Sequence, residues 1–442
     1  MTRKTELQAG AARRIITPPP GIFLIGYGDR SKGNTGVHDD LTATALVLSD
    51  GITRLALVAL DMLAINEFVV DRVRTRVAPI EVLICCSHTH SGPIAYAGAG
   101  SSHKDRKQID GLVDHIVSAV LEADAGVVPA RLEYASGKAG IAINRREKMP
   151  DGRMEIGRNP QGEVDRSLQV ISILKKGGER LATLVNFACH GTVLGPDNLL
   201  ASADWIGAMR TRVEVELGGL GLFLQGAAAN LNPDMYWDDA RAFEMVLEQG
   251  RSVAEAVLTA VRAGSKQLRP LPLMIERVET WLPTESPVTG PHPPKNYGKS
   301  LLAMAHLPGW MAFLADPLLN QRYPWKSRIE ARDGFWSVPM RVNAVRMGEL
   351  ALVTFAAETF TEIGLRIKQN SPARHTLFTS LTDGCISYLH TADSHSEGGY
   401  EVDTATLAYR YPGRLKAECE AIALDRTRHL LARLWGKKDD PN

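Results

Sequence analysis

Two closely spaced histidines follow a short apolar run and alternate with hydroxyl side chains. The sequence SHTHSGP occupies residues 87–93, directly after the apolar run at 82–86. On an extended backbone, side chains two residues apart point to the same side, so His88 and His90 are expected to share one face. Such a pair suits a metal ligand beside a general acid or base. The H-x-H spacing alone does not exclude two unrelated histidines.

A third histidine also closes an apolar run. His190 ends the run at 181–188 and precedes Gly191 and Thr192. It is either a second metal ligand or a core histidine that is hydrogen-bonded to the backbone. Asp204, a short distance along the chain, could supply the carboxylate that often orients a metal-bound imidazole.

Glu358 and two tyrosines complete the set of candidate residues. Glu358 lies in an apolar stretch where a strand pattern gives way to a helix. A buried carboxylate must be paired or bound to a metal, although a glutamate at a helix start is also favoured by the helix dipole. Tyr388 and Tyr400 lie in glycine-containing segments, where tyrosines commonly serve packing.

These residues need strands and helices that bring their segments together. Apolar β-rich runs at 42–49 and 53–60 flank Asp50-Gly51, which predicts a hairpin. The same pattern predicts hairpins at 168–188 and 338–355 and a strand at 221–225. Helices are predicted at 106–123, 202–217 with Ser202 as N-cap, 238–263, 359–368 and 413–435. The alternation predicts an α/β fold of two mixed β-sheets flanked by helices.

Composition limits the class of protein. The chain has 442 residues and a net charge of +1, which disfavours nucleic acid as a partner because phosphate binding needs a basic field. No apolar stretch is long enough to span a membrane. The five cysteines have no regular spacing, which favours reduced thiols. We therefore expect a cytoplasmic protein with a small-molecule substrate, and the oligomeric state is not predicted.

We expect one catalytic domain at 1–412 and a packed C-terminal helix at 413–442. His88 and Tyr388 can meet at one site only if the segments between them fold together. Within this domain, residues 281–337 combine a proline-rich stretch with Trp310, Trp325 and Trp336 and lack clear periodicity. Long irregular segments are usually functional loops or disordered, and we favour a lid over the substrate here.

Together, these motifs resemble the catalytic N-terminal domain of the neutral/alkaline non-lysosomal ceramidases, which are zinc-dependent amidases. The resemblance covers roughly residues 8–412. It is carried by Ile15-Ile16-Thr17-Pro18, Gly26-Tyr27, Asp61-Met62, the SHTHSGP segment, Asn144-Arg145, His190-Gly191-Thr192, Ser202-Ala203-Asp204, Glu358 and, more loosely, Tyr388 and Tyr400.

The resemblance implies specific roles for these residues. The Zn²⁺ ligands would be His88, His190, Glu358 and Tyr388. The side chains that face the substrate carbonyl or the attacking water would be those of His90, Arg145 and Tyr400. The implied activity is hydrolysis of an amide (N-acyl) bond by a water that the metal activates. His90 would shuttle the proton, and Arg145 or Tyr400 would stabilise the oxyanion.

The chain departs from the family pattern in ways that affect the substrate. Asn232 stands where the family has an active-site serine, and an amide cannot act as an alkoxide nucleophile, so Asn232 is expected to hydrogen-bond substrate instead. A signal peptide and the C-terminal immunoglobulin-like domain of secreted members are also not recognisable. These departures predict a substrate smaller or more polar than ceramide. Hydrolysis of an ester, a lactone or a sugar-derived compound, or an inactive ligand-binding relative, remain alternatives.

Overall fold

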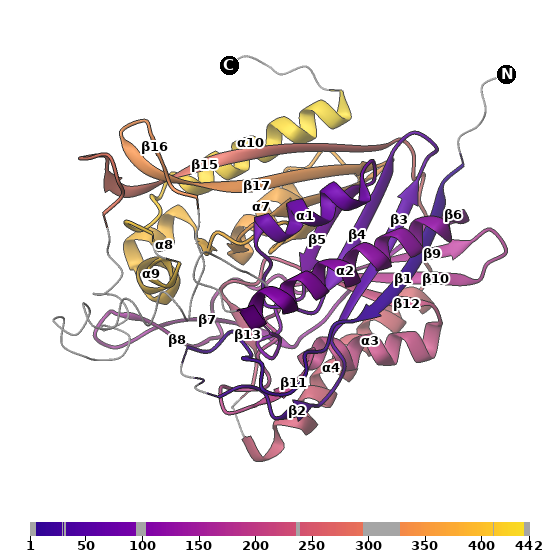
Figure 1. The fold of residues 1–442 in the computed structure, drawn as a ribbon, viewed down its shortest axis with the longest axis horizontal. Helices are drawn as coiled ribbons and strands as arrows, with labels where there is room; N and C mark the ends of the chain where they lie inside the picture. Colours follow the sequence, from indigo (N-terminus) through magenta and orange to yellow (C-terminus); the bar gives the residue numbers. More distant parts are fainter. Residues whose placement is uncertain are drawn as a thin grey trace.

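Two mixed β-sheets form the centre of the computed structural model, which describes residues 6–28, 30, 32–93, 103–235, 239–294, 328–409 and 411–436. Helices lie on the outer faces of the sheets (Figure 1). This arrangement confirms the predicted α/β class with two mixed sheets and flanking helices.

The larger sheet is built from the first 270 residues. It contains antiparallel hairpins and two parallel pairs, β4 with β5 and β10 with β12. Its order is β12 (Leu220–Gln225), β10 (Arg180–Phe187), β9 (Ser167–Lys175), β6 (Val128–Lys138), β1 (Gln8–Ile15), β3 (Thr42–Ser49), β4 (Arg54–Leu60) and β5 (Glu81–Cys86), with β14 (Lys266–Gln267) paired to β6.

The second sheet is built from the C-terminal part of the chain. The long antiparallel pair β15 and β17 carries β18, which is followed by a parallel partner, β20. The order is β15 (Leu273–Pro287), β17 (Phe335–Met347), β18 (Leu350–Phe355) and β20 (His375–Thr379), with β16 (Glu330–Arg332) on β17.

Three groups of helices cover the sheets from outside. The first group packs against β1 and β3, the second against β6, β9 and β12, and the third against the second sheet (Figure 1). They are α1 (Glu67–Val77) with α2 (His103–Ala125), α3 (Asp204–Leu217) with α4 (Ala242–Arg262), and α7 (Thr361–Gln369) with α10 (Cys419–Trp435).

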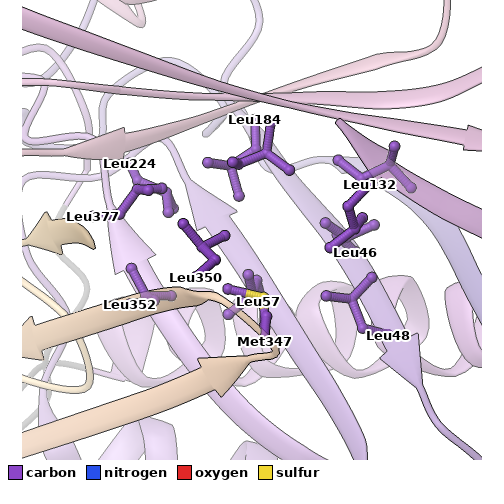
Figure 2. A pocket seen from close by; sticks show the side chains of 12 residues that line it. Leu46, Leu48, Leu57, Leu132, Leu184, Leu224, Met347, Leu350, Leu352 and Leu377 are labelled. Atoms are coloured by element: carbon purple, nitrogen blue, oxygen red, sulfur yellow. The ribbon is translucent and has the colours of Figure 1, made fainter. Parts of the chain in front are cut away.

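A layer of leucines joins the inner faces of the two sheets (Figure 2). Leu46 and Leu57 come from the N-terminal hairpin, Leu184 and Leu224 from the β10–β12 pair, and Leu352 from the second sheet. All five side chains are buried. Because burial of apolar surface is the main driving force of folding, this shared core fixes the two sheets against each other.

The carboxyl ends of the parallel pairs in these two sheets, β4–β5, β10–β12 and β18–β20, meet at one place. At the end of β20, Ser380 N–H donates to Gln225 O of β12 at 2.9 Å, and Asp383 N–H donates to Ile84 O of β5 at 2.9 Å. Side chains that follow the carboxyl ends of strands in α/β folds commonly form the functional site. His88, His190 and Glu358 follow β5, β10 and β18 respectively.

Several predicted element boundaries differ from the structure. Ala203, not Ser202, precedes the first turn of α3, and the Ser202 hydroxyl accepts from Asp204 N–H at 2.9 Å. Glu358 lies in a two-residue strand, β19 (Glu358–Thr359), and helix α7 begins only at Thr361. The C-terminal helix begins at Cys419 rather than at residue 413.

The expected lid at 281–337 begins and ends in strands. β15 runs to Pro287, and β17 begins at Phe335. Trp336 is buried in β17, so it is a core residue and not part of a loop over a substrate. Residues 295–327, with Trp310 and Trp325, lie outside the described residues, and the lid stays a prediction.

Among the helices in the described ranges, none is both long and apolar enough to cross a bilayer.

Candidate metal centre

His88 occupies a strained turn directly after β5. Its φ angle of 64° lies in the left-handed region, which residues other than glycine rarely adopt. The N–H of His88 anchors this turn by donating to Met62 O at 2.9 Å. The ring is anchored as well, because Nδ1 lies 2.8 Å from Leu63 O. A carbonyl oxygen only accepts, so Nδ1 of His88 carries the proton.

His190 is held in the same way by a different segment. Its Nδ1 lies 2.8 Å from Ala228 O and 2.9 Å from Leu231 O. The prediction that Asp204 orients this imidazole is wrong. The Asp204 carboxylate accepts from the N–H groups of Val193 and Leu194 instead, so it holds the loop that follows His190. The backbone carbonyl groups of Ala228 and Leu231 orient the His190 ring in place of the expected carboxylate.

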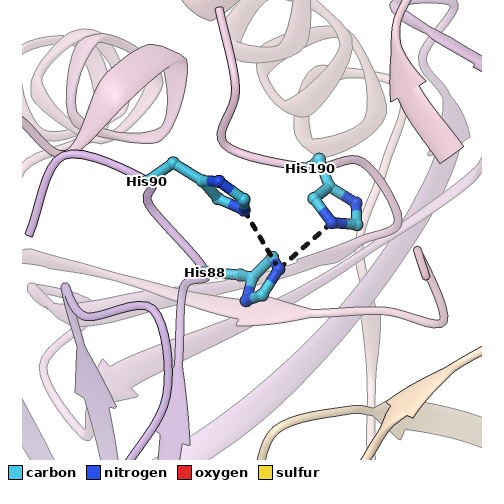
Figure 3. A group of neighbouring side chains, drawn as sticks. All are labelled: His88, His90 and His190. Carbon is cyan, nitrogen blue, oxygen red and sulfur yellow. Dashed lines mark hydrogen bonds between the residues drawn. The ribbon is translucent and has the colours of Figure 1, made fainter. Parts of the chain in front are cut away.

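The unprotonated nitrogens of the two rings face each other. His88 Nε2 and His190 Nε2 are 3.1 Å apart (Figure 3). Burial, helped by Arg145, lowers the pKa of His190 to about 4, so this ring is neutral near pH 7. With both Nδ1 atoms protonated, neutral rings present two lone pairs to one point. Two lone pairs so close together repel unless a proton or a cation lies between them.

Glu358 brings a negative charge to the same point. Its Oε2 is 3.2 Å from His88 Nε2 and 3.6 Å from His190 Nε2, and within the described residues this buried oxygen has no hydrogen-bond partner. Burial opposes its charge, but positive charge on the two imidazoles and hydrogen bonds from them hold the pKa of Glu358 well below its usual range. Where both rings are neutral, a cation between them would have to supply that charge instead.

Tyr388 is placed beside Glu358 by a very short parallel ladder. Strand β19 pairs with β21 (Tyr388–Leu389), and Glu358 and Tyr388 are direct register partners. The Tyr388 hydroxyl accepts from Arg145 Nη2 at 3.2 Å. Burial, with Glu358 nearby, raises the pKa of Tyr388 well above its ordinary value, so the phenol is neutral near pH 7.

His90 lies at the open side of the cluster. Its Nε2 is 3.3 Å from His88 Nε2 (Figure 3). Unlike those of the other two rings, its buried Nδ1 has no hydrogen-bond partner in the described part of the chain. The backbone of Gly26 packs on this ring so closely that a Cβ there would lie 2.6 Å from it. Candidate ligand nitrogens of His88, His90 and His190 all lie within 4.8 Å of one another.

Arg145 connects the remaining predicted residues. Its Nη1 lies 3.2 Å from His190 Nε2 and 3.3 Å from Asn232 Oδ1. Its guanidinium carbon is 5.6 Å from the centre of the Tyr388 ring and 5.9 Å from that of Tyr400. Tyr400 is the most open of these residues, with 37% of its surface exposed. Asn232 therefore contacts Arg145, and all eight predicted residues belong to one connected group.

The donor set fits a divalent cation. Two imidazole nitrogens, a buried carboxylate oxygen and a nearby phenol supply the N and O ligands that Zn²⁺ takes. A cation at this point would relieve the repulsion between the two lone pairs and neutralise Glu358. His90 lies within reach of the same point, so the geometry allows it either as a further ligand or as a neighbouring base.

Two functional candidates escaped the sequence analysis. The Tyr409 hydroxyl lies 3.4 Å from Glu358 Oε1, and the Glu401 carboxylate accepts from Arg145 Nε at 2.8 Å. No motif singles out Tyr409. The sequence signal for Glu401 was its position next to Tyr400. The sequence did not show that Glu401 pairs with the consecutive arginines Arg145 and Arg146.

The fold and the cluster define an α/β protein with a buried histidine–carboxylate site at converging strand ends. Residues 8–223 match the family model described as "Neutral/alkaline non-lysosomal ceramidase, N-terminal". These residues make up just under half of the chain, and their match to this model confirms the resemblance in the motifs.

Named relatives show how far the similarity extends. The neutral ceramidase of Pseudomonas aeruginosa is 23% identical over 495 residues, covering 91% of this chain and 72% of that protein. The neutral ceramidase of Mycobacterium tuberculosis is 28% identical over 221 residues, covering 44% of this chain and 34% of that protein. The crystal structure of the Pseudomonas aeruginosa enzyme shares the fold, with a TM-score of 0.74, 18% identity and coverage of 98% of this chain and 75% of that one.

Proposed function

We propose that the chain is a zinc-dependent hydrolase that cleaves an amide (N-acyl) bond. One observation carries this proposal: His88 Nε2, His190 Nε2 and Glu358 Oε2 converge on a single buried point. The names of the ceramidase relatives support an N-acyl substrate. That the substrate is smaller or more polar than ceramide, as the sequence suggests, stays a prediction.

The residues around this point divide into two groups. His88, His190, Glu358 and Tyr388 would hold the ion. When bound, zinc supplies Lewis acidity that lowers the pKa of water and polarises a carbonyl.

Three further side chains would act on the substrate. His90 has a pKa well below its ordinary value, because of burial and then the neighbouring rings, so it is neutral near pH 7 and can accept a proton. Arg145 keeps its charge, since Tyr388, Glu401 and Glu358 outweigh burial and raise its pKa, and it can stabilise a developing oxyanion. Tyr400 would provide a second donor at the open side.

Asn232 would act through hydrogen bonds only. Its side-chain oxygen accepts from Arg145, and a carboxamide is not a nucleophile. A covalent acyl intermediate at this position is therefore not proposed, and water is the attacking group.

Two measurements test the proposal. Metal analysis of the purified chain should find one zinc per chain, lost on dialysis against a chelator and restored by Zn²⁺ together with activity. Hydrolysis should be assayed with a series of N-acyl compounds from acetyl to long-chain ceramide, and with esters that carry the same acyl groups. If the chain binds stoichiometric zinc and hydrolyses the esters but not the amides, the proposed metal site stands and the proposed amidase activity is refuted. A chain that binds no added zinc would refute both.

Tyr409 should matter for metal binding although it contacts no ligand nitrogen. It lies 3.4 Å from Glu358 Oε1, which leaves Oε2 directed at the histidines. We expect Tyr409→Phe to weaken zinc affinity about 10–100-fold, the usual effect of losing a group that orients a ligand. Competition with a chromophoric chelator measures the affinity.

Tyr411→Phe is the matched control for this prediction. Tyr411 is also buried, but its hydroxyl donates to the backbone at Ile386 O. This variant should bind zinc as the wild type does. Equal affinities for the two variants would show that Tyr409 does not orient Glu358.

A further inference from the structure

A buried carboxylate bridges two consecutive arginines next to the candidate metal centre. Glu401 is only 2% exposed. Its Oε1 accepts from Arg145 Nε at 2.8 Å and its Oε2 from Arg146 Nη1 at 2.9 Å. Both arginines are buried as well. Burying three charged groups of this kind costs desolvation free energy. Such a bridge next to the candidate metal centre therefore suggests a functional role.

The turn that carries Glu401 is held at its N-terminal side. It is a single π-helical turn, η3 (Tyr400–Thr404), and such turns are frequent at functional sites. Gly398 and Gly399, which precede it, have φ angles of 71° and 97°, which favour glycine. Arg146 Nη2 donates to Gly398 O at 2.9 Å, so Arg146 holds the turn in place while Glu401 reaches Arg145.

The position of Glu401 determines which side of Arg145 faces the site. A guanidinium is planar, and its five N–H groups point in fixed directions. With Nε bound to Glu401, Nη1 is directed at His190 and Asn232 and Nη2 at Tyr388. If the Nε contact were lost, the plane could rotate about the side-chain bonds, and both terminal nitrogens would move away from the reaction centre.

We propose that Glu401 is a positioning residue that fixes the Arg145 guanidinium toward the substrate carbonyl, with Arg146 as its anchor. This inference rests on the proposed hydrolase function, in which Arg145 stabilises the oxyanion. Glu401 acts only through Arg145 and contacts neither the predicted ligands nor the reacting atoms.

Glu401→Asp is the principal test. It keeps the charge that neutralises the two arginines and shortens the side chain by one methylene, so the fold should survive while the contact with Arg145 Nε is lost. We expect zinc stoichiometry to be unchanged and kcat to fall about 10–100-fold, as for other groups that orient a functional side chain, with a smaller change in KM. Glu401→Gln should have the same effect if it folds.

Glu397→Gln is the matched control. Glu397 lies four residues before Glu401, is half exposed and pairs with Arg146 Nη2 at 3.0 Å without contacting Arg145. Its loss removes an ion pair from the same network, and kcat should stay within about two-fold of the wild type because solvent screens the half-exposed carboxylate of Glu397.

A double-mutant cycle separates positioning from a purely structural role. If Glu401 acts through Arg145, Glu401→Asp should cause no further loss of kcat/KM in an Arg145→Gln background, because interacting residues are non-additive. Equal losses in both backgrounds, or a wild-type kcat in Glu401→Asp, would overturn the inference.

The structure of the variant keeps the inference separate from the proposed function. In zinc-bound crystal structures of the wild type and of Glu401→Asp, the Arg145 guanidinium of the variant should have turned away from Asn232 and Tyr388. An unmoved guanidinium would refute the positioning role even if the wild-type chain proved not to be an amidase. Absence of zinc and hydrolysis in the wild type, with a displaced Arg145 in the variant, would instead refute only the proposed function.

Discussion

Replacing His88 or His190 with alanine is expected to abolish both zinc binding and turnover. Each ring supplies one of the two Nε2 atoms that lie 3.1 Å apart beside Glu358. With one ring gone, one nitrogen, the carboxylate and the neutral phenol of Tyr388 remain, and this set is too weak for tight Zn²⁺ binding. Metal content after dialysis and the hydrolysis rate should both fall to background.

The same variants should remain folded. The His88 ring donates to Leu63 O, and its loss leaves one partly buried carbonyl without this donor, which costs at most about 1–3 kcal/mol. Circular dichroism and thermal unfolding should therefore show a folded chain with a lowered midpoint.

His429→Ala is the control for these variants. This histidine is partly exposed on α10 and pairs with Asp425, so its loss should change neither zinc content nor rate. Retention of stoichiometric zinc by both His88→Ala and His190→Ala would refute the metal centre.

Local patterns explain which parts of the fold were predictable. The hairpin at Asp50-Gly51 and the apolar run before SHTHSGP each lie within about 20 residues, and the structure has β3, β4 and β5 there. Because side chains at strand ends gather in α/β folds, His88 and His190 could be paired before any coordinates were known. The two mixed sheets followed from the same alternation of strands and helices.

Contacts between distant segments could not be predicted from local sequence patterns. The two-residue ladder that aligns Glu358 with Tyr388 has no periodicity to detect, and the sequence suggested a helix at Thr359. Asp204 was wrongly expected to orient His190, because that task falls to the carbonyl groups of Ala228 and Leu231. Every residue has a backbone carbonyl, so side-chain identity gives no sign of such a partner.

His90 is expected to contribute to the rate rather than to metal binding. The rings of His88 and His190 are each fixed by a carbonyl at Nδ1, whereas the buried Nδ1 of His90 has no partner in the described ranges. Ligand imidazoles almost always have such an orienting partner. A neutral ring that is not bound to the metal keeps a nitrogen free to accept and return a proton, as a general acid or base must.

His90→Ala should therefore keep one zinc per chain and lose kcat by about 10²–10⁴-fold, the range typical of a general acid or base. Zinc content and kcat should be measured on the same preparation, beside His88→Ala, which loses both. His90→Gln should also keep zinc but restore no rate, because a carboxamide does not titrate. Loss of zinc in His90→Ala would instead make His90 a ligand, and the three histidines that lie within 4.8 Å of one another would then hold the metal.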